Sequence, residues 1–131
     1  MSPKSPELER LSERIRGTLN SADLAGLGEL LAPDARWGAP ESEDADCRSR
    51  KEVVEWWGRG RQAGARARVT EVVPGAGTLL VGLKVTGTPE AERNGGEAER
   101  WQVLRVEAGR IVDIRGFDNR HAAALRAGVA D

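Results

Sequence analysis

The spacing of apolar residues changes once along the chain, near Arg66, and this change constrains the fold more than any other feature. Before Arg66, apolar residues recur every three or four positions, which is typical of amphipathic helices. The first such face carries Leu8, Leu11, Ile15 and Leu19, and a second, which Pro33 ends, carries Leu24, Leu27, Leu30 and Leu31. After Arg66, short runs rich in β-branched residues alternate with turn signals, as in strands. Helices followed by consecutive strands predict an α+β domain.

A capping box opens a third predicted helix. Ser49 and Glu52 form the pattern S-x-x-E, in which both side chains satisfy backbone N–H groups of the first turn. The helix is predicted from Arg50 to about Ala63, and Gly64 is well placed to end it. Before it we expect only a short extended piece, Asp34 to Trp37, and an acidic loop.

Four strands are predicted in the second half of the chain. Their ranges are Arg66 to Val73, Thr78 to Thr86, Glu97 to Val106 and Arg110 to Phe117. Because consecutive strands with short connections pair antiparallel, we expect one antiparallel sheet of about four long strands. Asp118 is then predicted to cap a short C-terminal helix that carries, on one side, Ala122, Leu125 and Val129.

Composition and charge exclude several classes of protein. The 131 residues suit a single domain over residues 1–131, and the 39% hydrophobic content can support a core. Twenty basic and twenty-one acidic residues give a net charge of −1, so we expect no nucleic-acid partner. No apolar run approaches the roughly 20 residues that cross a bilayer, and the polar N-terminus lacks a signal-peptide pattern, so we expect no membrane association and a cytoplasmic location. The single Cys47 fits a reducing compartment.

A local cluster of arginines departs from this charge balance. Four lie within ten residues: Arg59, Arg61, Arg66 and Arg68. The cluster indicates either a solvated helix end and strand start or a site for an anionic ligand.

Four stretches carry a resemblance to a known family. They are LLAPDARW, CRSRKEVVEWW, RARVTEVVPG and ERWQVLRVEAGRIVDIRGFDNR. The chain resembles the SnoaL-like proteins of the nuclear-transport-factor-2-like superfamily, common in actinobacteria. The resemblance implies a cone-shaped, strongly bent sheet wrapped around the N-terminal helices and a cavity, with homodimerisation through the outer sheet face. Members include polyketide cyclases, ketosteroid isomerases, dehydratases, epoxide hydrolases and proteins without catalytic activity, so the likeness bears on fold more than on function.

The aromatic residues are candidates for a ligand pocket. The chain has four tryptophans, one phenylalanine and no tyrosine. The tryptophans either fill the core or line a pocket, since both environments favour large aromatic side chains. Trp56 and Trp57 are adjacent on a helix and point about 100° apart, so both cannot be central. The ligand-binding candidates are Trp37, Trp57, Trp101 and Phe117.

Asp118 and His121 are the candidate acid–base residues. The family resemblance implies an acidic group in the cavity of catalytic members, and Asp118 follows the last strand. His121, the only histidine, lies three residues later, within reach across one helical turn. The alternatives are that Asp118 is only a helix cap and that His121 is a surface residue. Asp113 and Arg115 could form another polar pair, either inside the cavity or exposed.

Several kinds of site are not expected. One histidine and one cysteine do not make a metal cluster, no phosphate-binding loop occurs, and no nucleophile motif accompanies His121. Cys47 is expected to be inert because neighbouring acids raise a thiol pKa. We therefore expect no metal and no cofactor. The sequence favours a protein that holds a small apolar or polyketide-like molecule in an enclosed pocket, with cofactor-free isomerisation, cyclisation or dehydration as the chemistry that the resemblance allows. The alternative is a non-enzymatic dimerisation or interaction module.

Overall fold

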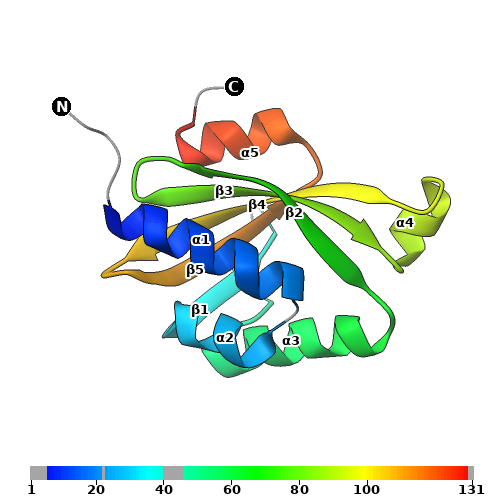
Figure 1. Cartoon of the computed structure of the whole chain (residues 1–131), viewed down its shortest axis with the longest axis horizontal. Coiled ribbons are helices and arrows are strands. Elements are labelled where there is room, and N and C mark those ends of the chain that lie inside the picture. Colours follow the sequence, from blue (N-terminus) through cyan, green and yellow to red (C-terminus); the bar gives the residue numbers. More distant parts are fainter. Residues whose placement is uncertain (1–5, 22, 40–45, 130–131) are drawn as a thin grey trace.

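The computed structural model describes residues 6–21, 23–39 and 46–129. Its elements follow the predicted order, with helices first, then strands, then a terminal helix (Figure 1). In chain order they are α1 Pro6–Ser21, α2 Leu24–Leu30, β1 Leu31–Gly38, α3 Arg50–Gln62, β2 Arg66–Pro74, β3 Thr78–Thr86, α4 Pro89–Arg93, β4 Ala98–Glu107, β5 Arg110–Phe117 and α5 Arg120–Ala127. In the described part of the chain, no helix has both the length and the apolar character to cross a membrane.

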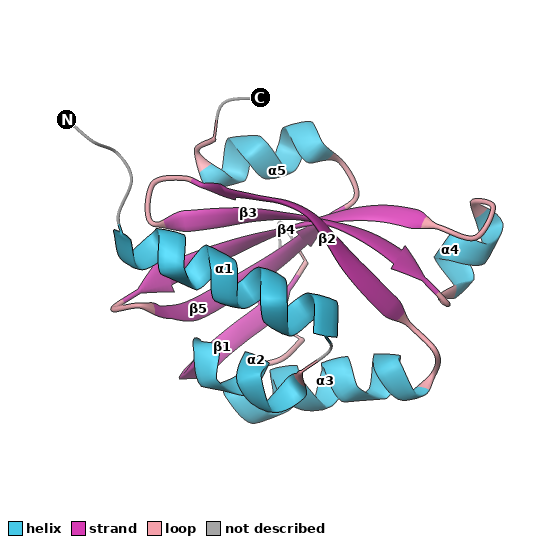
Figure 2. Cartoon of the chain, viewed as in Figure 1, coloured by secondary structure: helices cyan, strands magenta, loops and turns pink. Residues whose placement is uncertain are grey.

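One bent sheet organises the molecule. Its strand order is β1-β5-β4-β3-β2, and β2 to β5 form the predicted antiparallel meander. Helices α1, α2 and α3 lie on its concave face, while α5 lies on the opposite, outer face (Figure 2). The α+β class and the curved sheet are therefore confirmed.

The structure adds a fifth strand, β1, that the sequence pattern concealed. β1 pairs parallel to β5 at the sheet edge, with Trp37 beside Ile114, and the predicted piece Asp34 to Trp37 is only part of it. Leu30 and Leu31 continue the helical spacing of α2, but Leu31 already belongs to the strand. The pairing irregularity between Leu31 and Arg36 spans Pro33, and an edge strand tolerates a residue without an N–H group.

The concave face of the sheet carries the main core. All four predicted residues of α1, from Leu8 to Leu19, are buried there. They pack in one cluster with sheet residues that include Leu79, Val81, Leu83, Leu104 and Ile114. The main core thus ties the N-terminal helices to the central strands, and it leaves the far end of the concave face unfilled.

Helix α5 covers part of the outer face, but in a register that differs from the prediction. Asn119, not Asp118, caps the helix, because its side-chain oxygen accepts a hydrogen bond from the Ala122 N–H at 3.0 Å. The predicted stripe is wrong at Leu125, which is 69% exposed, whereas Val129 does pack against the buried residues beneath the helix. The helix instead packs its small residues against Leu80 and Val103, forming an outer cluster with Ala123, Ala124 and Ala127. Alanines allow a short helix to approach the sheet closely.

A β-bulge corrects the predicted alternation at the β4–β5 hairpin. The register shifts between Arg105 and Val106, so Val106 pairs with Ile111 rather than continuing the strict pattern. Strict alternation along β5 would place Ile111 on the face of Asp113 and Arg115, but it is buried in the main core. Ala108 and Gly109 join the two strands, and both have positive φ, as a two-residue turn requires.

Helix α4 interrupts the polar loop predicted between Gly87 and Gly96. Thr88 caps it by accepting a hydrogen bond from the Ala91 N–H at 3.1 Å, and Pro89 occupies its first turn. Gly87 has φ +77°, and a Cβ there would collide with the carbonyl oxygen of Gly64. This close approach holds the start of α4 against the end of α3.

Candidate functional site

A cavity of about 670 Å³ occupies the unfilled end of the concave face. Its volume lies in the range of small-ligand sites. The ends of α1 and α3, helix α2, all five strands of the sheet and the start of α4 contribute to its walls. The walls are mainly apolar and include Leu24, Leu27, Trp37, Trp57, Ala67, Leu83 and Val85.

Three tryptophans form one wall of this cavity. The Trp37 ring, from β1, lies 5.1 Å from the Trp56 ring and 5.6 Å from the Trp57 ring, tilted by 36° and 44°. These separations are those of favourable aromatic pairs. Two backbone hydrogen bonds of 3.0 Å between Trp37 and Cys47 hold β1 in place beside the entry to α3. The three residues, Trp37, Trp56 and Trp57, are called the tryptophan wall below.

The third helix presents two of these rings because its cap fixes its start. Ser49 accepts a hydrogen bond from the Glu52 N–H at 3.2 Å, and the Glu52 carboxylate accepts one from the Arg48 N–H at 2.6 Å. Trp57 then faces the cavity, whereas Trp56, the adjacent residue, is 47% exposed at its margin. Trp37 and Trp57, two of the ligand-binding candidates from the sequence, thus both lie at the cavity.

Trp101 and Phe117, the other two ligand-binding candidates, do not belong to the tryptophan wall. They pair across β4 and β5, and both pack in the outer cluster beneath α5. Trp101 also borders the cavity, but its side chain acts on the outer face, where it helps to lower the pKa of the Glu71 carboxyl group. Phe117 does not line the cavity.

The acid–base candidates also lie away from the cavity. Asp118 and His121 are exposed around the start of α5, and neither belongs to the cavity lining. Asp118 is not the helix cap either, since Asn119 takes that position. Their catalytic role stays a prediction, and the cavity does not support it.

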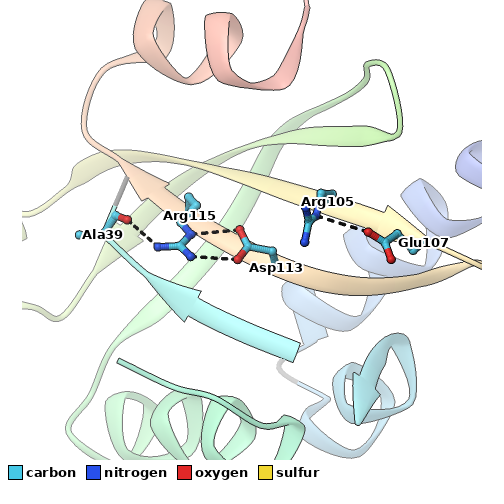
Figure 3. A network of polar contacts seen from close by, with 5 residues as sticks. All are labelled: Ala39, Arg105, Glu107, Asp113 and Arg115. Carbon is cyan, nitrogen blue, oxygen red and sulfur yellow. Dashed lines mark hydrogen bonds and ion pairs between the residues drawn. The ribbon is translucent and has the colours of Figure 1, made fainter. Parts of the chain in front are cut away.

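Asp113 and Arg115 form a buried pair on the outer face of β5. The Arg115 guanidinium donates two hydrogen bonds of 3.0 Å to the Asp113 carboxylate and a third, of 2.9 Å, to the Ala39 carbonyl (Figure 3). The side chains are only 7% and 13% exposed. This pair ties the end of β1 to β5 and is not a polar group of the cavity.

Two polar residues of β4 that were not among the candidates from the sequence also line the cavity. Arg100 and Gln102 lie on the concave face, two residues apart, and both line the cavity. Strand alternation places both on one face, opposite Trp101, but polar residues on a strand are more often solvent-facing. Arg100 lies beside Glu90 of α4, with N–O distances of 3.5 Å to both carboxylate oxygens. Gln102 is 8% exposed, and its side chain makes no hydrogen bond with any described residue.

Other polar residues at the cavity have structural partners. Asn20 accepts a hydrogen bond from the Val69 N–H at 2.8 Å, and Asp23 caps α2 through the Gly26 N–H at 2.9 Å. Of the four clustered arginines, Arg61 and Arg66 line the cavity, while the other two do not. Arg66 donates to the carbonyl of Arg61 at 3.1 Å.

The described residues offer little for nucleophilic or metal chemistry. Burial first, and the charges of Glu52 and Asp46 second, raise the pKa of the Cys47 thiol, which also lies 3.6 Å from the Glu52 carbonyl. A raised pKa keeps the thiol protonated and weakly nucleophilic. Among the residues described, no group of three or more His, Cys, Asp or Glu side chains is placed to hold a metal ion.

A family model for the SnoaL-like domain matches residues 12–114, most of the chain and all of the cavity-lining strands except the end of β5. The chain belongs to the SnoaL-like family. Among curated proteins, no sequence matches this SnoaL-like chain significantly.

Solved structures share the fold of this SnoaL-like chain. A candidate polyketide cyclase from Sinorhizobium meliloti is 21% identical, with a TM-score of 0.66 over 86% of this chain and 100% of the other. A candidate ketosteroid isomerase from Kribbella flavida is 17% identical, with a TM-score of 0.68 over 85% and 76%. An epoxide hydrolase from M. tuberculosis is 14% identical, with a TM-score of 0.63 over 95% and 94%. At these identities the likeness establishes the fold alone.

Proposed function

We propose that this SnoaL-like protein binds a small, mainly apolar molecule whose ring system lies against Trp37 and Trp57. The observation that carries the proposal is the cavity of about 670 Å³ with its tryptophan wall. An interaction module without a ligand has no need of an open interior, so the cavity favours binding over the dimerisation alternative. The ring-containing compounds expected from the family resemblance, polyketide-like molecules among them, fit such a wall.

The expected energetics agree with a ring ligand. A ring system that buries roughly 200 Å² of apolar surface gains about 5 kcal/mol at ~25 cal/mol per Å². Part of this gain offsets the loss of translational and rotational freedom on association. Apolar contact alone therefore supports weak binding, and tighter binding requires polar contacts inside the cavity.

Binding is better supported than turnover. Structural relatives include proteins named as a cyclase, an isomerase and an epoxide hydrolase, and cofactor-free acid–base chemistry is what such names suggest. That chemistry requires a titratable group beside the ligand. Three carboxylates line the cavity, but Asp23 caps α2 and Glu90 faces Arg100. Asp46, exposed at the margin, is the remaining one.

Calorimetric titration with 2-naphthol, followed in parallel by tryptophan fluorescence, tests the proposal. We expect saturable binding that changes the fluorescence, because an indole beside the ring exchanges its neighbours. The variant Ala67→Phe adds a ring inside the cavity and is expected to weaken binding at least tenfold. Ala63→Phe makes the same change at an exposed position outside the cavity lining and serves as the control.

Either of two results would count against the proposal. The first is that the unmodified protein shows no saturable binding to 2-naphthol. The second is that Ala67→Phe binds 2-naphthol as tightly as Ala63→Phe does.

A further inference from the structure

Arg100 and Gln102 supply hydrogen-bond donors at one end of the cavity. Arg100 and Gln102 project from the same face of β4, about 6.6 Å apart along the strand at ~3.3 Å per residue. Gly116 of β5 pairs with Gln102 and also lines the cavity. A Cβ at Gly116 would lie 3.8 Å from a guanidinium nitrogen of Arg100, so the guanidinium lies over this bare stretch of strand.

The Gln102 amide faces the cavity with its hydrogen-bonding capacity unused. Its side chain makes no hydrogen bond with the described residues, and the residue is only 8% exposed. Among these residues the buried side-chain atoms that lack a partner are Arg50 Nε and Trp57 Nε1, so the Gln102 amide is open to the cavity rather than sealed in the core. A ligand in the cavity is positioned to hydrogen-bond it.

Arg100 is held more loosely than two other paired arginines, Arg115 of β5 and Arg120 of α5. Arg115 and Arg120 bind their carboxylates bidentately, at 3.0 and 3.0 Å and at 2.8 and 3.0 Å. Arg100 reaches both oxygens of Glu90 only at 3.5 Å, with side chains 37% and 42% exposed. The guanidinium therefore keeps hydrogen-bonding capacity that Glu90 does not use.

We propose that Arg100 and Gln102 together bind the carboxylate of an amphipathic ligand whose ring lies against the tryptophan wall. The inference rests on the proposed function and specifies its ligand class as a ring-bearing carboxylic acid. A carboxylate only accepts hydrogen bonds, and this end of the cavity supplies guanidinium and amide donors. Glu90 then acts as a competing carboxylate that the ligand displaces from Arg100.

Two probes of nearly equal size separate charge from shape. The probes are 1-naphthylacetate and its neutral analogue 1-naphthylacetamide, titrated by calorimetry at pH 7. Because a charge-assisted hydrogen bond contributes about 1.5–3 kcal/mol, we expect the carboxylate to bind at least tenfold more tightly than the amide. Arg100→Met is expected to remove this preference while leaving the affinity for the amide within about threefold.

Variants of the neighbouring residues distinguish a binding role from a structural one. Gln102→Leu keeps the side-chain volume and removes the unpaired amide, so the midpoint of thermal unfolding is expected to stay or rise while carboxylate affinity falls. Glu90→Gln removes the competing charge and is expected to raise carboxylate affinity. The control is Arg105→Met, at an exposed position on the outer face of the same strand. It should change neither the carboxylate affinity nor the midpoint of thermal unfolding.

The possible results distinguish a failure of the carboxylate site from a failure of the proposed ring-binding cavity. If both probes bind equally to the unmodified protein, or Arg100→Met keeps the preference for the carboxylate, the carboxylate site is wrong while the ring-binding cavity stands. If Gln102→Leu destabilises the protein and leaves carboxylate affinity unchanged, Gln102 is structural. If neither probe binds, the carboxylate site is wrong, and the titration with 2-naphthol decides whether the ring-binding cavity stands.

Discussion

At the scale of single residues, the outer face holds a polar group that couples stability to pH. The Glu71 carboxylate accepts hydrogen bonds from Arg120 at 2.8 and 3.0 Å, and the Trp101 side chain also helps to lower its pKa. The Arg120 hydrogen bonds are the main reason that the pKa of Glu71 lies below its ordinary value of 4.5, although burial acts in the opposite direction. The group joins β2, β4 and α5 at the point where Gly82 leaves room on β3.

This coupling has a defined direction. A carboxyl group whose folded-state pKa is lowered stabilises the fold above its unfolded pKa and loses that contribution as pH falls through the folded pKa. We expect Glu71→Gln to lower the free energy of unfolding by about 1 kcal/mol at pH 7, allowing for partial solvent screening. Urea denaturation should show this difference shrinking as the pH is lowered below about 4.5.

The exposed pair Arg105–Glu107 provides the control for this experiment. Its atoms are 3.7 Å apart and its side chains are more than 60% exposed, so Glu107→Gln should change stability little at any pH. A Glu71→Gln difference that stays constant from pH 7 to pH 3 would contradict the assignment.

At the scale of elements, local signals and distant contacts differed in how well the sequence revealed them. The α3 capping box, the two turn residues between β4 and β5, and the β-branched run of β3 each act within a few residues, and the corresponding elements match the predictions. β1 depends on pairing with β5, a contact that leaves no local pattern. The α5 register depended on which of two adjacent residues, Asp118 or Asn119, caps the helix, and both are good caps.

The difference between local signals and distant contacts also explains which site residues the sequence revealed. Trp37 and Trp57 were found because large aromatic residues dominate both cores and pockets, whichever element carries them. Asp118 and His121 were chosen for their chemistry, and their positions depend on how α5 packs across the outer face. Arg100 and Gln102 carried the right signal in the strand alternation, but only the bent sheet shows that their face encloses a cavity.

The assignment of the α5 cap can be tested directly. Asn119→Ala removes the acceptor for the Ala122 N–H and is expected to cost about 1 kcal/mol of unfolding free energy. Asp118→Ala, one residue earlier and exposed, is expected to cost less than about 0.5 kcal/mol. Thermal or chemical denaturation that shows the larger loss for Asp118→Ala would place the cap where the sequence suggested.

At the scale of the whole molecule, the association state is a prediction that the family resemblance supplies. A further reason to expect a partner is that the outer face of the sheet also carries apolar residues, which a monomer would leave open. Helix α5 covers much of that face with Ala123, Ala124 and Ala127, so a partner would contact what α5 leaves uncovered. We nevertheless expect a homodimer through the outer face.

Light scattering on the full chain at concentrations of roughly tens of micromolar tests this expectation, since weak-to-moderate dimers are populated in that range. A mass near twice 14.1 kDa is the expected result. The mass of a single chain across that range would contradict the predicted homodimer. It would indicate that α5 covers the outer face in place of a second chain.

The parallel pairing of β1 with β5 also affects the order in which the molecule assembles. Leu31 and Ile111, which face each other in the sheet, are 80 positions apart (111 − 31), whereas the β2–β5 hairpins close over short connections. Long loops close late because their ends lose more entropy on meeting. The meander is therefore expected to form first, and the edge strand to dock last, bringing Trp37 against α3. A transient release of that strand from the native protein would then separate Trp37 from α3 and break up the tryptophan wall while leaving the meander intact.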